Sequence, residues 1–416
     1  MRVLISGAGI AGPTLARLLA KTGASITIVE KADTIRPHGQ NVDIKGSALA
    51  ALEKMGLLDE VLRCNTTEKG AQFIDPNGMP IAPFPVQEGV NASLTSAFEI
   101  MRSDLSRILY DATKHLPNID YIFGCTVKNV VSNDEHSVKV ELEDGGIREF
   151  DLLVAADGQW SKIRKQCFPS ESVKVIHKGM YAAYWTVPRL PTDNDLWNIY
   201  LALGSRIIAT RPDPYGTTRA MMTCMPLDDS KEQAWRIATR SGREAQQGLM
   251  KAEFKDAGWQ AERLLDAMGQ SPDFYFQAIE QVRMSTWWQG RVICIGDAAY
   301  APTPLTGMGT PLAILGAYIL AGELSKLGDI QHPKKAFEAY ESAFRPYVER
   351  TQKIAPVFPG IVHPKAGMQR WLVQLFLRCV SSAVAIPWVS KRLPSETDDE
   401  GFPLPIYPCF EDGKWD

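Results

Sequence analysis

The chain has 416 residues, of which 45% are apolar, and it carries 45 Lys and Arg against 48 Asp and Glu. This length allows two or three domains with a sizeable core, and the net charge of −3 gives no electrostatic basis for nucleic-acid binding. The seven cysteines show no Cys-x-x-Cys pair and no metal-ligand spacing, so we expect reduced thiols, no metal site and a cytoplasmic location.

The N-terminal segment has the pattern of a dinucleotide-binding βαβ unit. An apolar strand over residues 3–6 runs into Gly7-x-Gly9-x-x-Gly12, a helix follows to about residue 22, and a second strand over 25–29 ends at Glu30. In such a unit the first glycine makes the tight turn and the second lets the backbone approach a pyrophosphate. The third packs the helix on the sheet, and the acid binds ribose hydroxyls. The pattern therefore predicts nucleotide binding.

Glu30 also bears on which nucleotide binds. A carboxylate at the end of the second strand would repel the 2′-phosphate of NADP, so the site suits FAD or NAD better. Lys31, the next residue, favours NADP instead.

The next part of the chain is predicted to form short elements around this unit. We expect a strand over 40–44, a helix over 47–55, a hairpin over 73–85 with a turn at 77–78, and a helix over 100–114. Arg102 lies at the entrance of this last helix, with Ser103 as its N-cap. Arg102 could reach a phosphate or a ribityl oxygen there, and a surface role is equally consistent.

Three strands over 119–123, 126–132 and 138–142 are predicted to form an antiparallel meander. A buried strand then ends at Asp157-Gly158, the position where an open α/β sheet binds ligands. Ser161 is placed to cap a short basic helix that contains Arg164.

Residues 173–224 are rich in β-branched and aromatic residues, which predicts an antiparallel sheet inserted between the two halves of the nucleotide-binding domain. Helices are expected over 231–267. One face of such a sheet packs on helices, and the other could form the wall of a pocket. Tyr184, Arg211 and Met222 are candidates for that wall, although core or surface positions explain each of them more simply.

The segment from residue 291 to 327 is the one around which the rest is organised. A β-branched strand over 292–295 ends at Gly296-Asp297, and a loop with prolines and glycines leads to an apolar helix. Thr310 is expected as the N-cap of that helix and Pro311 as its first residue. Asp297 could accept hydrogen bonds from a polyol such as a ribityl chain.

The loop before this helix suits a flat, electron-rich ligand. Gly307 and Gly309 allow close approach, and the free N–H groups at the helix start favour nearby negative charge, such as that of a reduced flavin. Pro304 in the same loop is a candidate substrate contact. Read alone, the segment is equally consistent with an ordinary strand-loop-helix connection.

Two further helices are expected over 333–353 and 368–384, followed by a tail from residue 394 along the surface. The run 371–389 is weakly charged, but Gln374, Arg378 and Pro387 interrupt it, so it is not predicted to span a membrane. A packed helix is the preferred interpretation, and a membrane-surface helix is the alternative.

Three separated motifs now stand together: the glycines at 7, 9 and 12 with Glu30, the segment from Asp157 to Arg164, and Gly296-Asp297 with its loop. In this combination, over residues 1–330, the chain resembles the class A flavoprotein monooxygenases, single-component FAD enzymes of the para-hydroxybenzoate hydroxylase fold. The run 39–58 and the chain length look most similar to the tetracycline-inactivating and secondary-metabolite hydroxylases.

The resemblance implies an α/β protein with a Rossmann-like FAD-binding domain, an inserted antiparallel β-sheet substrate domain and C-terminal helices. The implied FAD-binding domain covers 1–172 and 273–330, with 73–100 contributing to the substrate domain of 173–272, and 331–416 forms the helices and tail. The implied cofactor-binding residues are Gly7, Gly9, Gly12, Glu30, Lys31, Arg102, Asp157, Asp297, Gly307, Gly309 and Thr310.

The resemblance also implies a reaction. NADPH or NADH reduces FAD, O₂ forms a C4a-hydroperoxyflavin, and one oxygen atom hydroxylates an aromatic or polyketide-like small molecule. Monomers or dimers are expected, with no nucleic-acid partner. None of the six histidines lies in a recognisable catalytic motif, so no general base is assigned.

The chain departs from the family pattern at two positions. Tyr300 stands where His is usual, and Thr310-Pro311 stands where Asn or Ser is usual. Three other functions stay open: another flavin oxidoreductase, an NAD-dependent dehydrogenase, and a flavin-binding regulatory protein. A dehydrogenase would explain the N-terminal glycines but not the segment at Gly296-Asp297.

Overall fold

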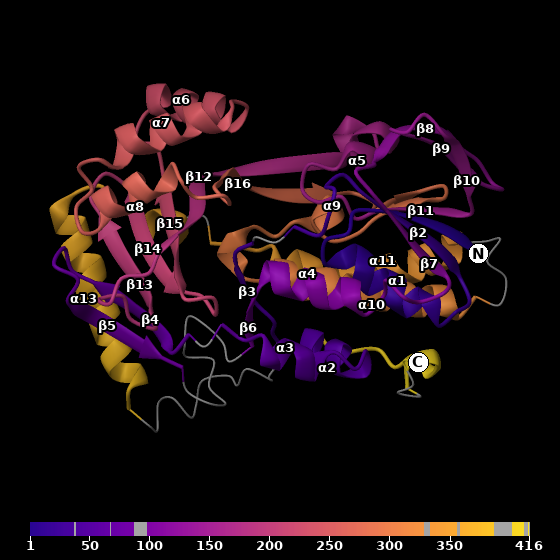
Figure 1. Cartoon of the computed structure of the whole chain (residues 1–416), viewed down its shortest axis with the longest axis horizontal. Helices are drawn as coiled ribbons and strands as arrows, with labels where there is room; N and C mark the ends of the chain where they lie inside the picture. The colour runs from indigo at the N-terminus through magenta and orange to yellow at the C-terminus, as the bar shows by residue number, and fades with distance from the viewer. Residues whose placement is uncertain are drawn as a thin grey trace.

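The computed structural model describes residues 1–36, 39–66, 68–86, 98–327, 333–355, 358–386, 402–411 and 415. Two large sheets lie side by side along the long axis of the molecule, and strands β12 and β16 run from one toward the other (Figure 1). Both chain termini lie at the same end, beside the first sheet. No helix among the described residues is long and apolar enough to cross a membrane.

The first sheet has six strands in the order β17-β18-β11-β1-β2-β7, and all neighbours except β17 and β18 are parallel. Its strands are β1 (Arg2–Ser6), β2 (Ser25–Glu30), β7 (Ile119–Phe123), β11 (Leu152–Ala155), β17 (Trp288–Gln289) and β18 (Val292–Cys294). The central strands are nearly continuous apolar runs because both faces of this parallel sheet are buried.

The helices associated with this half fill most of its core. They are α1 (Ala11–Ala20), α2 (Ser47–Lys54), α3 (Leu58–Arg63), α4 (Arg102–Asp111), α5 (Lys162–Cys167), α9 (Asp297–Tyr300), α10 (Gly309–Ser325) and α11 (Pro333–Thr351). Helix α10 is buried on all sides, and it packs against α1, α2 and α11. This explains its uniformly apolar sequence.

The strand β7 corrects one prediction. It pairs in parallel with β2 and so belongs to the six-stranded sheet rather than to the meander. The meander consists of β8 (Val127–Asn133), β9 (Val138–Leu142) and β10 (Ile147–Phe150). Gly124, with a φ of +64°, turns the chain between β7 and β8, and such a turn does not reveal which strand will be the neighbour.

The second sheet has seven strands in the order β16-β12-β15-β14-β13-β4-β5, antiparallel except where β13 meets β4. Its strands are β4 (Gly70–Ile74), β5 (Pro80–Pro85), β12 (Val173–Pro188), β13 (Trp197–Ala202), β14 (Arg206–Pro212), β15 (Thr217–Cys224) and β16 (Tyr275–Met284). An early hairpin therefore joins strands from the middle of the chain. The domain boundaries given above stay a prediction.

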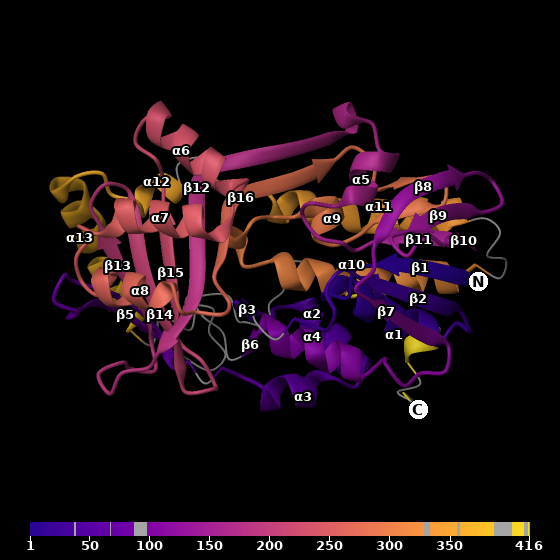
Figure 2. The same ribbon diagram turned by 45° about the horizontal axis from the view of Figure 1, so that its top comes forward.

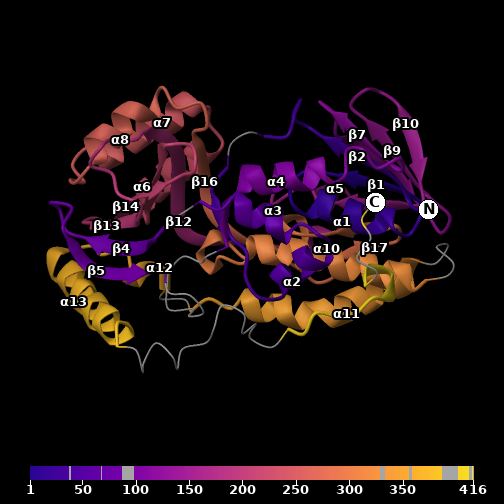
Figure 3. The ribbon, with the colours of Figure 1, turned by 60° about the horizontal axis from the view of Figure 1, so that its bottom comes forward.

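Helices cover the second sheet on both sides (Figure 3). On one side lie α6 (Asp229–Thr239), α7 (Arg243–Phe254) and α8 (Ala261–Met268), and on the other lies α13 (Gly367–Val384). The two-stranded ribbon of β3 (Asn41–Asp43) and β6 (Glu99–Met101) adjoins both halves. The remaining short elements are α12 (Phe358–Ile361) and the 3₁₀ turns Ser170–Ser172, Pro304–Thr306 and Pro408–Phe410.

The described part of the tail has exposed residues, as predicted, but most of its aromatic residues are buried against the core. Tyr407 is fully buried against α10, and a Cβ at Gly322 would overlap the tyrosine ring. The Tyr407 hydroxyl donates to Glu323 over 2.8 Å. The aromatic residues of the tail, not its prolines and acids, decide where it lies.

Tyr300, the departure from the family pattern, points into the core. Its hydroxyl is 2.9 Å from that of Tyr340, and its ring packs on Trp287. A Cβ at Gly316 on α10 would overlap the Tyr300 hydroxyl, so the tyrosine and the glycine depend on each other.

We therefore expect Gly316→Ala to destabilise the protein by about 1–2 kcal/mol, because overpacking outweighs the gain of about 1 kcal/mol in helix propensity. In a Tyr300→Phe background the missing hydroxyl leaves room, and the same substitution should be neutral or stabilising. Urea unfolding of the two single variants and the double variant measures this coupling. Additive effects would show that the two positions are independent.

Candidate active site

The glycine turn after β1 is held by direct backbone packing. Gly7 has a φ of +111°, and a Cβ there would overlap the carbonyl oxygen of Ala156; a Cβ at Gly12 would overlap the carbonyl of Gly7. Only glycine fits at either position. By contrast, a Cβ at Gly9 would have one neighbour within 4 Å, the Arg102 guanidinium at 3.9 Å. The turn is therefore closely packed against the backbone at Gly7 and Gly12, and it leaves open space at Gly9.

Glu30 closes this turn from the end of β2. Its carboxylate accepts from the N–H of Ala8 over 2.9 Å and from that of Ala32 over 3.1 Å. These bonds fix its orientation, and a carboxylate has further lone pairs for hydroxyl donors. Lys31 is exposed.

Arg102 is brought to the turn by strand β6 and not by a long helix. Residues 100 and 101 belong to β6, α4 begins at Arg102, and Met101 takes the N-cap position that was predicted for Ser103. A Cβ at Gly39 would lie 3.0 Å from that of Arg102, so the loop before β3 passes close by. The N–H of Arg102 donates to the carbonyl of Gln40 over 2.9 Å, whereas its guanidinium makes no hydrogen bond or ion pair among the described residues.

Asp297 is the first residue of α9, directly after β18. Burial raises the pKa of its carboxyl, and the charge of Arg102 opposes that shift, which places the two groups near each other. A Cβ at Gly309 would lie 3.9 Å from Asp297 Oδ1. Glycines 9, 39 and 309 therefore meet around Arg102 and Asp297. Figure 2 shows α9 and α10 between the two sheets.

Helix α10 begins two residues earlier than predicted. Gly309 is its first residue, Met308 is the N-cap, and Thr310 is buried inside the first turn. Gly307 adopts a left-handed conformation with a φ of +64°, which turns the chain sharply enough to bring the helix start forward. Pro311 falls in the first turn, where its missing N–H removes no helical bond. The N–H groups at the start of α10 therefore stay near Asp297.

The segment after β11 has two functions that the sequence did not separate. The buried Oδ1 of Asp157 has no hydrogen-bond partner among the described residues, while Oδ2 accepts from the N–H of Lys162 over 3.0 Å. Burial raises the pKa of Asp157. Arg164, by contrast, donates to the carbonyls of Ala298 over 2.6 Å and Gln159 over 2.7 Å. Through the bond to Ala298, Arg164 holds α5 against α9.

One face of the second sheet turns toward this region. Tyr184 of β12 stands directly between Met221 of β15 and Tyr275 of β16, and the two tyrosine rings are 6.5 Å apart. Leu305, from the turn before α10, packs against a small apolar cluster on the same face, as does Tyr184. Pro304 itself is exposed. The loop at α10 and this sheet face therefore meet.

Met222 does not lie on this face. It is fully buried in the cluster beneath α6–α8, so its predicted place in the wall is wrong by one residue, and Met221 points the other way. Alternation identifies two faces of a strand, but it does not show which one helices will cover.

Arg211 is held by two buried carboxylates. It donates to both oxygens of Glu68, over 2.8 and 2.9 Å, and forms an ion pair with Glu99, which also accepts from Thr66 over 2.6 Å. Its guanidinium lies 4.3 Å from the ring of Trp197. These contacts use Nε and Nη2 of Arg211 and fix it where β6 meets the second sheet. The predicted substrate contact stays a prediction.

Tyr275 and Gln277 of β16 were missed by sequence reasoning. Tyr275 is 46% exposed, and the charges of Arg102, Asp297 and Arg36 act on it, so it lies on the part of β16 that faces that group. Gln277 donates to the Tyr184 hydroxyl over 3.5 Å. The alternation of residues 275, 277 and 279 was the signal that could have revealed them.

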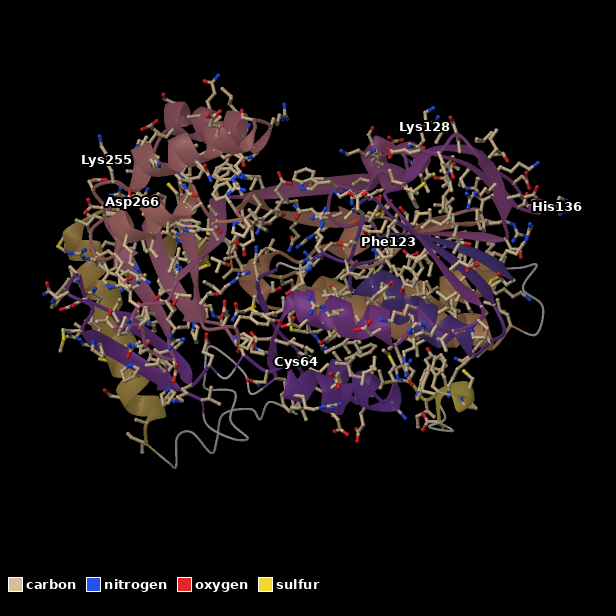
Figure 4. All side chains as sticks on the ribbon, in the orientation of Figure 1. Cys64, Phe123, Lys128, His136, Lys255 and Asp266 are labelled. Atoms are coloured by element: carbon tan, nitrogen blue, oxygen red, sulfur yellow. The ribbon has the colours of Figure 1, made fainter. Side chains whose placement is uncertain are left out.

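Two of the described histidines, His363 and His136, have structural or outer positions. His363 is buried between Thr223 and the carbonyl of Pro359, and its pKa is lowered by burial to about 4. His136 lies at the outer end of the meander, far from Asp266 at the other end of the molecule (Figure 4). His38 and His332 lie outside the described residues.

The arrangement fits FAD. Two helix starts, at α1 and α10, carry free N–H groups suited to a pyrophosphate and to negative charge on a ring. Gly9 permits close approach, Asp157 offers a buried oxygen without a partner among the described residues, and the charges of Asp297 and Arg102 lie near each other. Among the described residues no cluster of His, Cys, Asp and Glu could hold a metal ion.

Comparison with known proteins agrees with this reading. Residues 1–355 match the model of the FAD binding domain family. Monooxygenase CTB7 of Cercospora beticola is 36% identical, covering 91% of this chain and 92% of its own. The FAD-dependent monooxygenase asL6 of Sarocladium schorii is 32% identical over 99% of both chains. The crystal structure of tetracycline destructase Tet(51) superposes with a TM-score of 0.76 at 26% identity, covering 93% of this chain and 99% of the other.

Fold and site together define a class A flavoprotein monooxygenase, and they confirm the predicted α/β fold class and family resemblance. The chain belongs to the FAD binding domain family.

The polyol role of Asp297 gives a direct test. Asp297→Ala should raise the dissociation constant of FAD by an amount equivalent to about 1–3 kcal/mol, because hydrogen bonds to a charged acceptor are lost. Asp266→Ala, at an exposed position of α8, is the matched control and should leave the dissociation constant of FAD unchanged. Fluorescence titration of the apoprotein with FAD measures both. Equal affinities would remove Asp297 from the site.

Glu99 gives a test by pH. Burial raises its pKa to about 7, Glu68 and Asp43 add to this, and Arg211 and Thr66 oppose it. Between its ordinary value of 4.5 and about 7, the folded protein holds a proton that the unfolded chain has released. The free energy of unfolding therefore falls as pH rises through this window.

Relative to Glu99→Gln, which cannot ionise, the wild type should lose on the order of 1–3 kcal/mol between about pH 5 and pH 8. Urea unfolding of both proteins across this range measures the difference. Parallel curves would mean that Glu99 titrates at its ordinary pKa.

Proposed function

We propose that the protein uses NADPH or NADH and O₂ to hydroxylate an aromatic or polyketide-like small molecule, with FAD as its cofactor. The observation that carries the proposal is the meeting of two surfaces: the polar group at Arg102 and Asp297, and the aromatic and apolar sheet face around Tyr184. The redox chemistry, hydride acceptance and activation of O₂, comes from FAD.

The chain's own residues bind and orient that cofactor. The start of α1 with Gly9 would hold the pyrophosphate, Glu30 a ribose, and Asp297 the polyol. The start of α10 stabilises negative charge on the reduced ring system, because its free N–H groups carry partial positive charge.

The sheet face would hold the substrate. Met221, Tyr184 and Tyr275 form a row across three strands, and the apolar cluster beside Leu305 excludes water. Burial raises the pKa of Tyr184 to about 12, so its hydroxyl stays neutral and can donate a hydrogen bond to a carbonyl or phenolate oxygen. An aromatic wall with a few polar groups suits a planar, oxygenated substrate.

The similar proteins support this substrate class. Two are named monooxygenases, and the solved structure at TM-score 0.76 is named for tetracycline. A cytoplasmic location and a monomeric or dimeric state remain part of the proposal.

The purified protein should show flavin absorption bands, and a panel of phenolic and polyketide compounds should contain one that accelerates oxidation of NADPH or NADH. With ¹⁸O₂ the product should gain one labelled oxygen atom, as measured by mass spectrometry. A colourless protein that FAD does not reconstitute would contradict the site. Flavin bands with substrate turnover but no label in the product would favour another flavin oxidoreductase.

A further inference from the structure

Helix α13 carries a continuous apolar stripe on its solvent side. Six exposed residues share one helical face at spacings of three and four, which is the pattern of an amphipathic helix facing outward. This α13 stripe consists of Met368, Trp371, Leu372, Leu375, Phe376 and Cys379. Trp371 is 59% exposed and Phe376 63%, so the largest rings are also among the exposed ones.

The opposite face of α13 explains why the stripe points outward. Val373, Leu377 and Val380 pack on the second sheet, and the Ser381 hydroxyl donates to the carbonyl of Pro83 over 2.6 Å. The helix is therefore fixed on β5. It combines the two predictions made from the sequence, because one face packs on the sheet and the other is exposed, as in a helix that binds a membrane surface. Figure 3 places α13 along the outer edge of the molecule, away from both termini.

The described charges of α13 and of the residues just before it have one sign. Residues 362–386 contain no Asp or Glu, although the whole chain has a net charge of −3. The cations of this range are Lys365, Arg370 and Arg378. Arg370 donates to the Tyr200 hydroxyl over 3.4 Å, and neither it nor Lys365 nor Arg378 forms an ion pair with a described carboxylate. Their charge is not neutralised within the described structure.

A second copy of the chain is a poor partner for this face. In an antiparallel pairing centred on the stripe, Arg370 of one copy would lie opposite Arg378 of the other. Like charges that meet without a neutralising acid oppose association. An anionic surface meets the same cations favourably.

We propose that α13 docks on the surface of an anionic lipid bilayer, with its axis parallel to the membrane plane. The stripe enters the boundary between headgroups and acyl chains, where Trp and Phe are favoured, and the flanking cations contact lipid phosphates. This binding does not span the membrane, and it does not depend on the proposed reaction.

Co-sedimentation of the full-length, FAD-loaded protein with vesicles tests the proposal. The protein should bind phosphatidylglycerol–phosphatidylcholine vesicles and bind pure phosphatidylcholine vesicles much less, with affinity falling as salt rises. The double variant Trp371→Glu/Phe376→Glu should bind at least about ten-fold more weakly, since it loses the two largest apolar contacts and gains like charge with the lipid.

The matched control is Ile237→Glu/Leu227→Glu, which makes the same change of charge at two exposed apolar positions near α6. It should bind vesicles as the wild type does apart from a small electrostatic loss, and both double variants should keep bound flavin. Comparison with Trp371→Phe isolates the fluorescence of Trp371. Iodide should quench this fluorescence in solution, and the emission should shift to the blue on anionic vesicles.

Three results would overturn the proposal. The first is no binding to anionic vesicles, or equal loss in both double variants. The second is a dimer in sedimentation equilibrium that the stripe variant abolishes, which would make a second copy the occupant. The third is a Trp371 closed to iodide without vesicles, which would mean that another part of the chain covers the stripe.

Discussion

The close packing of backbone on backbone at the first turn is the constraint on which the rest of the site depends. Gly7 lies against the carbonyl of Ala156, and Gly12 lies against that of Gly7, with no room for a side chain between them. This brings β1, β11 and α1 together at one point. Since β18 pairs with β11, Asp297 is carried to the same edge of the sheet. A side chain at either glycine would separate the elements that hold the cofactor.

Charged contacts join the two halves beside the cofactor region. Arg211 of the second sheet pairs with Glu99 of the ribbon, and Arg219 donates to the carbonyl of Gly39 beside Arg102 while pairing with Asp273. Partners of opposite charge set register as well as attraction. The second sheet is therefore fixed on the same β3–β6 ribbon that positions Arg102. A shift of the second sheet relative to the ribbon would therefore move Arg102 as well.

Much of this was predictable because the relevant signals are local. The turn can be identified from the sequence alone. Its glycines have an obligatory conformation, a strand precedes them, and an acid stands at the end of the next strand. The failures have a common cause in three-dimensional packing. Met222 and Met221 differ only in which face α6–α8 cover, and β7 differs from a meander strand only in its neighbour. The use of Arg164 depends on the carbonyl of Ala298, which is 134 residues away in the chain.

The buried tail has a consequence for how the protein is made. Tyr407 and Phe410 complete the packing around α10, whose start faces the cofactor, while the strands of the same half begin at Arg2. Domains on a ribosome fold as their last contacts emerge. The core around α10 therefore stays incomplete until residues 407–410 have left the ribosome, whereas the second sheet, complete by Met284, has all its strands outside earlier. The cofactor half therefore begins to emerge before the second sheet but completes its core later.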